Sequence, residues 1–222
     1  MSSIHISSKN RQEIAKIIES ARERGSKVLY YDALRILKLA GASVINSFLA
    51  LNTQEVMIFA SQIEPPFVLK RIKDALLSNR EIQIYKDIST PLDALNIALK
   101  DGEVLENEYF VIQETAPKDL KLSIFTADRD IHLHDRRNRV EIILPIDLTV
   151  EELINQKETL KTFLFNATET EDYDIKALGI LLLIVSSIKS LFEEIDRLEI
   201  NSFYLYRDGL GYIVTDAYIW FE

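Results

Sequence analysis

The sequence of 222 residues contains no cysteine. Disulfide bonds, thiolate metal sites and a cysteine nucleophile are therefore excluded, and the composition fits a reducing or a hot cytoplasm. Positive charge is also scarce, since 26 lysines and arginines stand against 35 aspartates and glutamates, giving a net charge of −9. We expect no nucleic-acid partner, because a phosphate backbone requires a basic patch.

Long hydrophobic runs are missing as well. The most apolar stretch, 178–188, is too short to span a bilayer and predicts a buried helix. The first residues are polar and contain no apolar segment of the secretion-signal type. We therefore expect a cytoplasmic protein without a membrane partner.

Glycine is the third scarcity. The chain has six glycines, and none lies between Gly102 and Gly179. Loops that hold phosphate groups are usually glycine-rich, because the backbone must approach the ligand closely. The middle of the chain therefore lacks the usual material for such a loop.

The last stretch of the chain predicts a β-hairpin. Two runs rich in β-branched and aromatic residues flank the turn Arg207–Gly211, where Asp-Gly supplies the positive φ of a tight loop. Asn201 enters the first strand and Asp216 ends the second, so their oxygens could meet on one face. An amide beside a carboxylate suits Mg²⁺. The alternative is a solvated hairpin that carries one Asn and one Asp.

Elsewhere the periodicity alternates between helix and strand. The length allows one large domain or two small lobes. Helices are predicted near 10–24, 31–40, 53–60, 91–100, 149–165 and 175–195, and strands near 44–51, 67–70, 81–88, 109–114, 120–126 and 140–146.

The hairpin carries a family resemblance. Glu199-Ile200-Asn201, Asp208-Gly209 and Val214-Thr215-Asp216-Ala217 resemble the closing signature of the ATP-grasp domain in the acyl-CoA synthetase family. More narrowly, they are similar to the β subunit of ADP-forming acetyl-CoA and succinyl-CoA synthetases. The resemblance implies that Asn201 and Asp216 hold the Mg²⁺ of the nucleotide. Ser202 stands where the family usually has proline.

A second match to the family lies nearer the start of the chain. Val68-Leu69-Lys70 resembles the strand end from which the family's lysine reaches the nucleotide phosphates. The alternative is a strand-end lysine that points to water. Gln113 and Glu114 fall on the strand whose backbone meets the adenine edge in the family. A polar strand end without a ligand is the alternative there.

Departures from the family reduce the expected activity. Ser78 occupies the position of a histidine thought to take part in phosphoryl transfer, and a serine without an adjacent base is a poor acceptor. The glycine-rich turn that the resemblance implies looks deleted, since the corresponding segment contains Arg136, Arg137 and Arg139 and no glycine, and Lys121 stands at an acidic position of the family. We therefore expect weak or absent catalysis.

The segment that this chain has in place of the family's glycine-rich turn allows two further interpretations. His132 and His134 are two apart, so a strand would place both on one side, where Asp135 could complete a metal cluster. Chance spacing is the favoured alternative. The arginines could bind an anion in place of the lost loop, but a solvated hairpin tip is favoured.

The resemblance implies an α+β ATP-grasp fold with two lobes, 1–105 and 106–222, around a nucleotide cleft. It implies Mg²⁺ and ATP or ADP as cofactors and a CoA-binding α-type subunit as the partner, and it leaves homo-oligomerisation open. One expected function is a nucleotide-binding acid–CoA ligase subunit with weak phosphoryl transfer. The other is a pseudoenzyme that binds or regulates a CoA-binding subunit. The acyl substrate is open.

Overall fold

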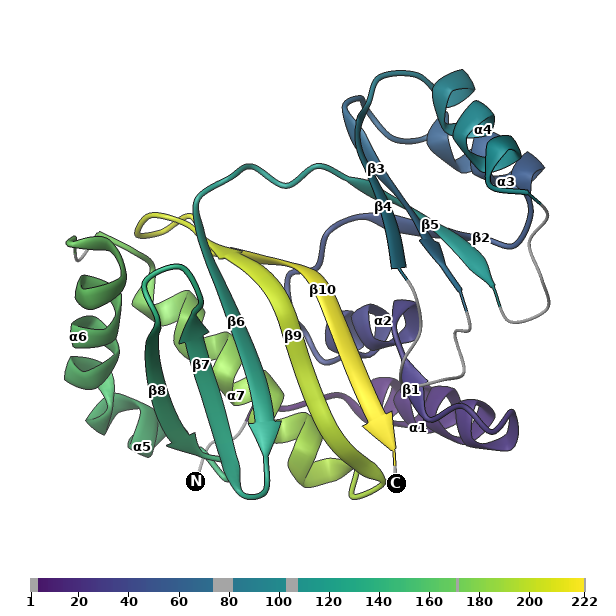
Figure 1. Cartoon of the computed structure of the whole chain (residues 1–222). Coiled ribbons are helices and arrows are strands. Elements are labelled where there is room, and N and C mark those ends of the chain that lie inside the picture. Colours follow the sequence, from purple (N-terminus) through teal and green to yellow (C-terminus); the bar gives the residue numbers. More distant parts are fainter. Residues whose placement is uncertain (1–3, 74–81, 103–107, 171, 222) are drawn as a thin grey trace.

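The computed structural model describes residues 4–73, 82–102, 108–170 and 172–221. These residues form a six-stranded sheet, a four-stranded sheet and the helices packed on them (Figure 1). All strand pairs within the two sheets are antiparallel. The α+β class predicted from the sequence is confirmed.

The C-terminal hairpin lies near one edge of the large sheet, whose strand order is β1-β10-β9-β6-β7-β8. Gly209 and Gly211 both have φ +78° in the turn, a conformation that only glycine adopts without strain. The predicted hairpin is confirmed. The strands are β1 (Val28–Leu29), β6 (Leu120–Ala127), β7 (Asp130–Asp135), β8 (Val140–Pro145), β9 (Ile195–Leu205) and β10 (Tyr212–Phe221).

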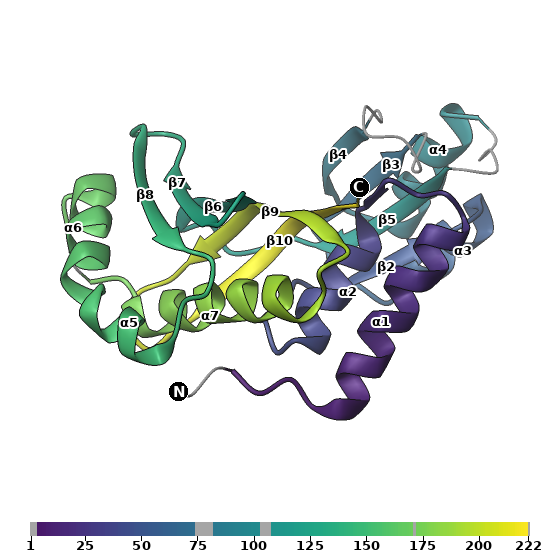
Figure 2. The same ribbon diagram turned by 90° about the horizontal axis from the view of Figure 1, so that it is seen from below.

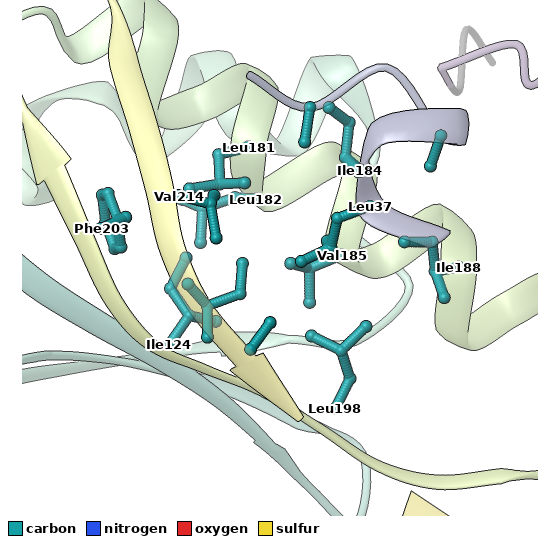
Figure 3. Close-up of a cluster of buried hydrophobic side chains, with 14 of the residues drawn as sticks. Leu37, Ile124, Leu181, Leu182, Ile184, Val185, Ile188, Leu198, Phe203 and Val214 are labelled. Carbon is teal, nitrogen blue, oxygen red and sulfur yellow. The ribbon is translucent and has the colours of Figure 1, made fainter. Parts of the chain in front are cut away.

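The main core fills the space between the large sheet and the helices on one of its faces (Figure 2). Leu181 and Leu182 of the long apolar helix α7 lie beside Ile124 and Phe203 of the sheet (Figure 3). No described helix is both long and apolar enough to cross a membrane. The helices are α1 (Ser8–Glu23), α2 (Tyr31–Leu39), α5 (Val150–Asn155), α6 (Lys157–Thr168) and α7 (Ile175–Leu191).

The small sheet is covered by α3 (Thr53–Ala60) and α4 (Pro91–Lys100), which begin at the predicted caps Asn52 and Thr90. Its strand order is β2-β5-β3-β4. Alternate residues of its central strands face α3 and α4 and form a second core. The strands are β2 (Ser47–Ala50), β3 (Phe67–Ile72), β4 (Ile82–Ile88) and β5 (Tyr109–Glu114).

The opposite face of the small sheet meets the large one. Ile72 and Val111 of the small sheet form a third buried cluster with Tyr30, and Tyr218 of β10 packs against it. The Tyr30 and Tyr218 rings lie 5.2 Å apart. β3 and β5 are buried on both faces, and the polar residues Lys70, Arg71 and Gln113 are among their buried side chains.

Some predicted boundaries were wrong. The helix expected over 149–165 is two helices separated at Gln156, although Thr149 and Glu152 do form the capping box at its start. The helix expected to reach residue 195 ends at Leu191, because Ile195 already begins β9. The short strand β1 was not predicted, since two residues carry no periodicity.

The predicted lobes, 1–105 and 106–222, do not coincide with the two sheets. β5 follows residue 105 but pairs within the small sheet, and α1, β1 and α2 precede it but pack with the large sheet. Residue 105 itself lies outside the described residues, so the boundary along the chain stays a prediction.

Candidate functional site

Lys70 lies where the two sheets meet. Along β3, Leu69 faces the core under α3 and α4, so the alternation turns Lys70 toward the large sheet. Its ammonium donates to Asp216 Oδ1 at 2.5 Å and to the Tyr30 hydroxyl at 2.9 Å. The residue is only 3% exposed. The interpretation of Lys70 as a strand-end lysine pointing to water is therefore wrong.

Tyr30 completes a three-residue cluster with Lys70 and Asp216. Its hydroxyl donates to Asp216 Oδ1 at 2.6 Å. Burial, followed by the nearby Asp216 charge, raises the pKa of Tyr30 well above its ordinary value. Sequence reasoning missed Tyr30, which is one of nine tyrosines and sits in no motif.

Gln113 and Glu114, the two residues expected near an adenine, differ in burial and in hydrogen-bond partner. Gln113 is buried, and its side-chain amide donates to the Thr215 carbonyl of β10 at 2.8 Å. Glu114 accepts a hydrogen bond from Asn46 at 3.0 Å in an exposed position. Gln113 thus ties the small sheet to the strand that carries Asp216, next to the Lys70 contact.

The register of the hairpin places the two expected magnesium ligands near each other along the strands. Asp216 pairs with Ser202, the neighbour of Asn201, and the register shifts on both sides of Asp216. Asp216 belongs to the inter-sheet cluster, whereas Asn201 lines a cavity of about 940 Å³ on the large sheet. Their joint role as ligands stays a prediction.

The cavity that Asn201 borders lies between β6, the β7–β8 turn and the end of α6. Its lining contains polar residues and both signs of charge. Ser123 lines it and is buried, and its hydroxyl has no hydrogen-bond partner among the described residues. The other charged and amide residues of the lining are Asp119, Lys121, Asp135, Arg136, Arg137, Asn138, Asn166 and Glu169.

The β7–β8 turn has its own internal bonding. Both carboxylate oxygens of Asp135 accept backbone N–H groups, from Arg137 at 2.9 Å and from Asn138 at 3.3 Å. Arg136, Arg137 and Arg139 are exposed, and Arg136 contacts Glu199 at 3.4 Å. The arginines thus form a solvated tip, two of them also bordering the cavity.

The histidine pair lies on one side of β7, as predicted, but its acidic partner is different. Asp135 is buried and engaged in the turn, so it does not join the pair. Instead, Glu141 Oε1 of β8 lies 2.7 Å from His132 Nδ1 and 2.6 Å from His134 Nε2. Hydrogen bonding from His132, supported by His134, lowers the pKa of Glu141. Ser78, the expected histidine position, lies outside the described residues.

Comparison of the sequence with known families finds no matching family model. No curated protein matches it either. Solved structures do match, at low identity and over nearly the whole chain. PH1788 from Pyrococcus horikoshii has a TM-score of 0.80 at 18% identity and covers 96% of this chain and 99% of its own.

Dinucleotide-forming acetyl-coenzyme A synthetase 1 from Candidatus Korarchaeum cryptofilum is also similar. Its complex with coenzyme A, Ca-AMPCP and HgCl⁺ has a TM-score of 0.76 at 20% identity and covers 93% of this chain and 99% of its own. Its complex with coenzyme A and Mg-AMPPCP has a TM-score of 0.72 at 20% identity, covering 94% and 100%. The chain has the ATP-grasp fold, as the hairpin signature implied.

Proposed function

We propose that the chain is a divergent ATP-grasp subunit of the ADP-forming acyl-CoA synthetase type, which binds a magnesium nucleotide where its two sheets meet. The observation that carries the proposal is the contact of Lys70 from the small sheet with Asp216 from the large sheet. The resemblance assigns phosphate to the first residue and Mg²⁺ to the second. Their approach from opposite sheets is the arrangement that a nucleotide held between lobes requires.

The donor set fits a magnesium nucleotide. Lys70 provides a buried positive charge for a phosphate group, and Asp216 and Asn201 provide the carboxylate and amide oxygens that Mg²⁺ prefers. Bound Mg²⁺ neutralises charge on the β- and γ-phosphates. Gln113 reaches β10 beside this centre through its bond to the Thr215 carbonyl, and the resemblance assigns Gln113 and Glu114 of β5 to the adenine end.

Nucleotide binding has to break the contact between Lys70 and Asp216. A single oxygen of Asp216 accepts hydrogen bonds from both Lys70 and Tyr30. The contact satisfies the proposed phosphate and metal ligands with each other, so it competes with nucleotide binding. A ligand that needs a minor form binds with an affinity reduced by the population of that form. We expect weak binding for this reason.

Phosphoryl transfer is expected to be weaker still. Backbone N–H groups of a glycine-rich turn stabilise phosphate charge in such enzymes. Here the N–H groups of Arg137 and Asn138 are already bonded to Asp135, and the turn contains no glycine.

The partner proposed for the chain is a CoA-binding α-type subunit. The coenzyme A complexes of the Korarchaeum enzyme, whose domain matches nearly the whole chain, support that choice.

Calorimetric titration with ATP and ADP, each with and without Mg²⁺, tests the nucleotide site. The wild-type chain is compared with an Asn201→Ala/Asp216→Ala double variant. Asp172→Ala serves as the control, because it removes an exposed carboxylate that pairs only at the surface with Arg207. We expect magnesium-dependent binding in the wild type and the control and its loss in the double variant.

Absence of heat up to millimolar nucleotide, together with no nucleotide-induced rise in Tm, would contradict the proposal, because a ligand of the folded state must stabilise it. Binding that survives in the double variant would place the nucleotide elsewhere. Circular dichroism of each variant establishes that it is folded.

The buried contact of Lys70 and Tyr30 with Asp216 between the sheets favours a second function. Lys70, Tyr30 and Asp216 bond to one another, and Tyr218 packs against the buried cluster that contains Tyr30 at the same contact. On this alternative the chain is a pseudoenzyme that binds a CoA-binding subunit. Sedimentation analysis of the mixture with the CoA-binding subunit of the same organism tests it. Complex formation that is unaffected by nucleotide and by Asp216→Ala supports the pseudoenzyme, and nucleotide-dependent assembly contradicts it.

A further inference from the structure

The β7–β8 hairpin carries a group of metal-ligand side chains on the face turned away from the main core. Ile131 and Leu133 are fully buried in that core, so the alternation along β7 turns His132 and His134 to the opposite face. Glu141 of β8 is the direct cross-strand partner of His134. The three side chains are thus placed together by the register of a single hairpin.

Their ligand atoms converge on one point. His132 Nδ1, His134 Nε2 and one carboxylate oxygen of Glu141 all lie within 4.8 Å of one another. Both histidine nitrogens lie beside the same oxygen, at 2.7 and 2.6 Å. In a tetrahedral zinc site with bonds of about 2.0–2.1 Å, neighbouring ligand atoms are about 3.3 Å apart. Moving the carboxylate oxygen away from the two rings by less than about 1 Å would therefore bring both N···O separations to the spacing of a zinc site.

The histidine rings are partly fixed in advance. Phe125 of β6, the cross-strand partner of His132, stacks on its ring with centroids 4.4 Å apart and planes inclined by 10°. The Phe125 and His134 rings lie 5.2 Å apart. Arg197 in turn covers Phe125 at 5.4 Å. Because these contacts restrict ring rotation, less side-chain entropy is lost when a ligand is bound.

The ligand types select the metal. Two imidazoles and a carboxylate suit zinc and its neighbours among the transition metals, whereas Mg²⁺ prefers an all-oxygen environment. Side-chain exposures of 18%, 28% and 39% for His132, His134 and Glu141 leave one side open to water. Each ring uses a neutral nitrogen lone pair toward the metal, which requires only that its proton reside on the other nitrogen.

We propose that His132, His134 and Glu141 bind one divalent transition-metal ion of the zinc class, with a fourth coordination position open to solvent. The site is separate from the proposed magnesium position, since it uses neither Asn201 nor Asp216. It lies beside the turn that replaces the glycine-rich loop, on the sheet face that also carries Phe125.

Zinc binding to the full chain, measured by competition with a chromophoric chelator, tests the proposal. We expect one zinc ion per chain. His132→Gln/His134→Gln should lower the affinity by more than the roughly 10- to 100-fold that loss of an outer-shell partner typically costs. Glu141→Gln should lower it by a smaller factor, because both rings remain.

The chain provides its own matched control. It has three histidines, and the third, His5, is exposed at the other end of the sequence. His5→Gln should leave zinc affinity and stoichiometry unchanged. The substituted histidines lie on an exposed face, and circular dichroism checks that each variant is folded.

A second readout uses Co²⁺ as the probe. Tetrahedral or five-coordinate Co²⁺ absorbs visible light much more strongly than octahedral Co²⁺, so an intense visible band that disappears in His132→Gln/His134→Gln supports a protein-ligated site. Failure of the wild-type chain to bind zinc at micromolar concentration would overturn the proposal. Zinc binding that persists in the double histidine variant, or that is lost in His5→Gln, would overturn it equally.

Discussion

Two polar clusters in this molecule share one arrangement but are assembled differently. Lys70 and Tyr30 meet Asp216 where the two sheets meet, across sequence separations of 146 and 186 residues. His132 and His134 meet Glu141 within one hairpin, across separations of 9 and 7 residues. In each, one carboxylate oxygen has two partners. The first cluster depends on the docking of two sheets and the second only on strand register.

Burial separates the two clusters energetically. The Lys70 side chain is 4% exposed, whereas that of Glu141 is 39% exposed. Removing one partner of a buried ion pair leaves a charge without water or a counter-charge, whereas an exposed group is resolvated. Breaking the inter-sheet cluster should therefore destabilise the fold strongly, whereas breaking the hairpin cluster should cost little.

The sharpest test of this comparison removes the carboxylate from each cluster. Asp216→Ala should lower the free energy of unfolding by about 3 kcal/mol, at the low end for buried pairs because Asp216 keeps 22% side-chain exposure. Glu141→Ala should cost less than about 1 kcal/mol. Urea denaturation at neutral pH measures both. Equal losses would show that the two clusters do not differ as their burial implies.

A smaller effect is expected from the hydroxyl of the buried cluster. Tyr30→Phe removes a donor to the Asp216 carboxylate and should lower the free energy of unfolding by about 2 kcal/mol. Tyr31→Phe is the matched control on the adjacent residue. The Tyr31 hydroxyl donates to the neutral Ser47 carbonyl at 3.2 Å, so its removal should cost about 1 kcal/mol or less. If Tyr31→Phe lost more free energy of unfolding than Tyr30→Phe, the charged acceptor would not explain the effect.

Alkaline pH should distinguish the buried cluster in a second way. The pKa of Tyr30 is raised in the folded state, so its contribution is complete below the ordinary value of about 10 and is lost as pH rises toward the folded-state value. The stability difference between wild type and Tyr30→Phe should therefore fall by about 1.4 kcal/mol per pH unit above 10. Urea titrations on both sides of pH 10 measure it. A stability difference that does not change with pH would argue against a raised pKa of Tyr30.

The smallest effect belongs to the hairpin cluster under acid. Hydrogen bonding from His132 lowers the pKa of Glu141, so its stabilisation is present above the ordinary value of 4.5 and is lost as pH falls through the lower folded-state value. Because Glu141 is partly exposed, we expect a difference between wild type and Glu141→Gln of less than about 1 kcal/mol. Urea denaturation across pH 4.5 measures it. If the stability difference between wild type and Glu141→Gln grew as the pH fell, it would contradict a lowered pKa of Glu141.

Much of the fold could be predicted because its signals are local. The Asp-Gly turn fixed the C-terminal hairpin, Asn52 and Thr90 marked two helix starts, and the apolar stripe of α7 marked the core. The break at Gln156 was missed, because the sequence on both sides favours helix.

The candidate site was predicted in part. The motif identified Lys70 and Asp216 as functional candidates, but it indicated neither that they contact each other nor that Tyr30 joins them. His132 and His134 were placed on one side by period-2 alternation, yet Glu141 was not identified. Its position opposite His134 depends on the hairpin register, which the sequence around the turn did not reveal.

The sequence by itself determined the order of most of the helices and strands, the C-terminal hairpin and the faces on which side chains lie. These follow from backbone periodicity, turn chemistry and capping, which act over a few residues. Tertiary structure alone decided which faces meet. It buried Lys70 against Asp216, tied Gln113 to Thr215 and brought Glu141 to the histidines. Such partnerships depend on the packing of strands distant in sequence and on register, because a local pattern encodes a face but not its partner.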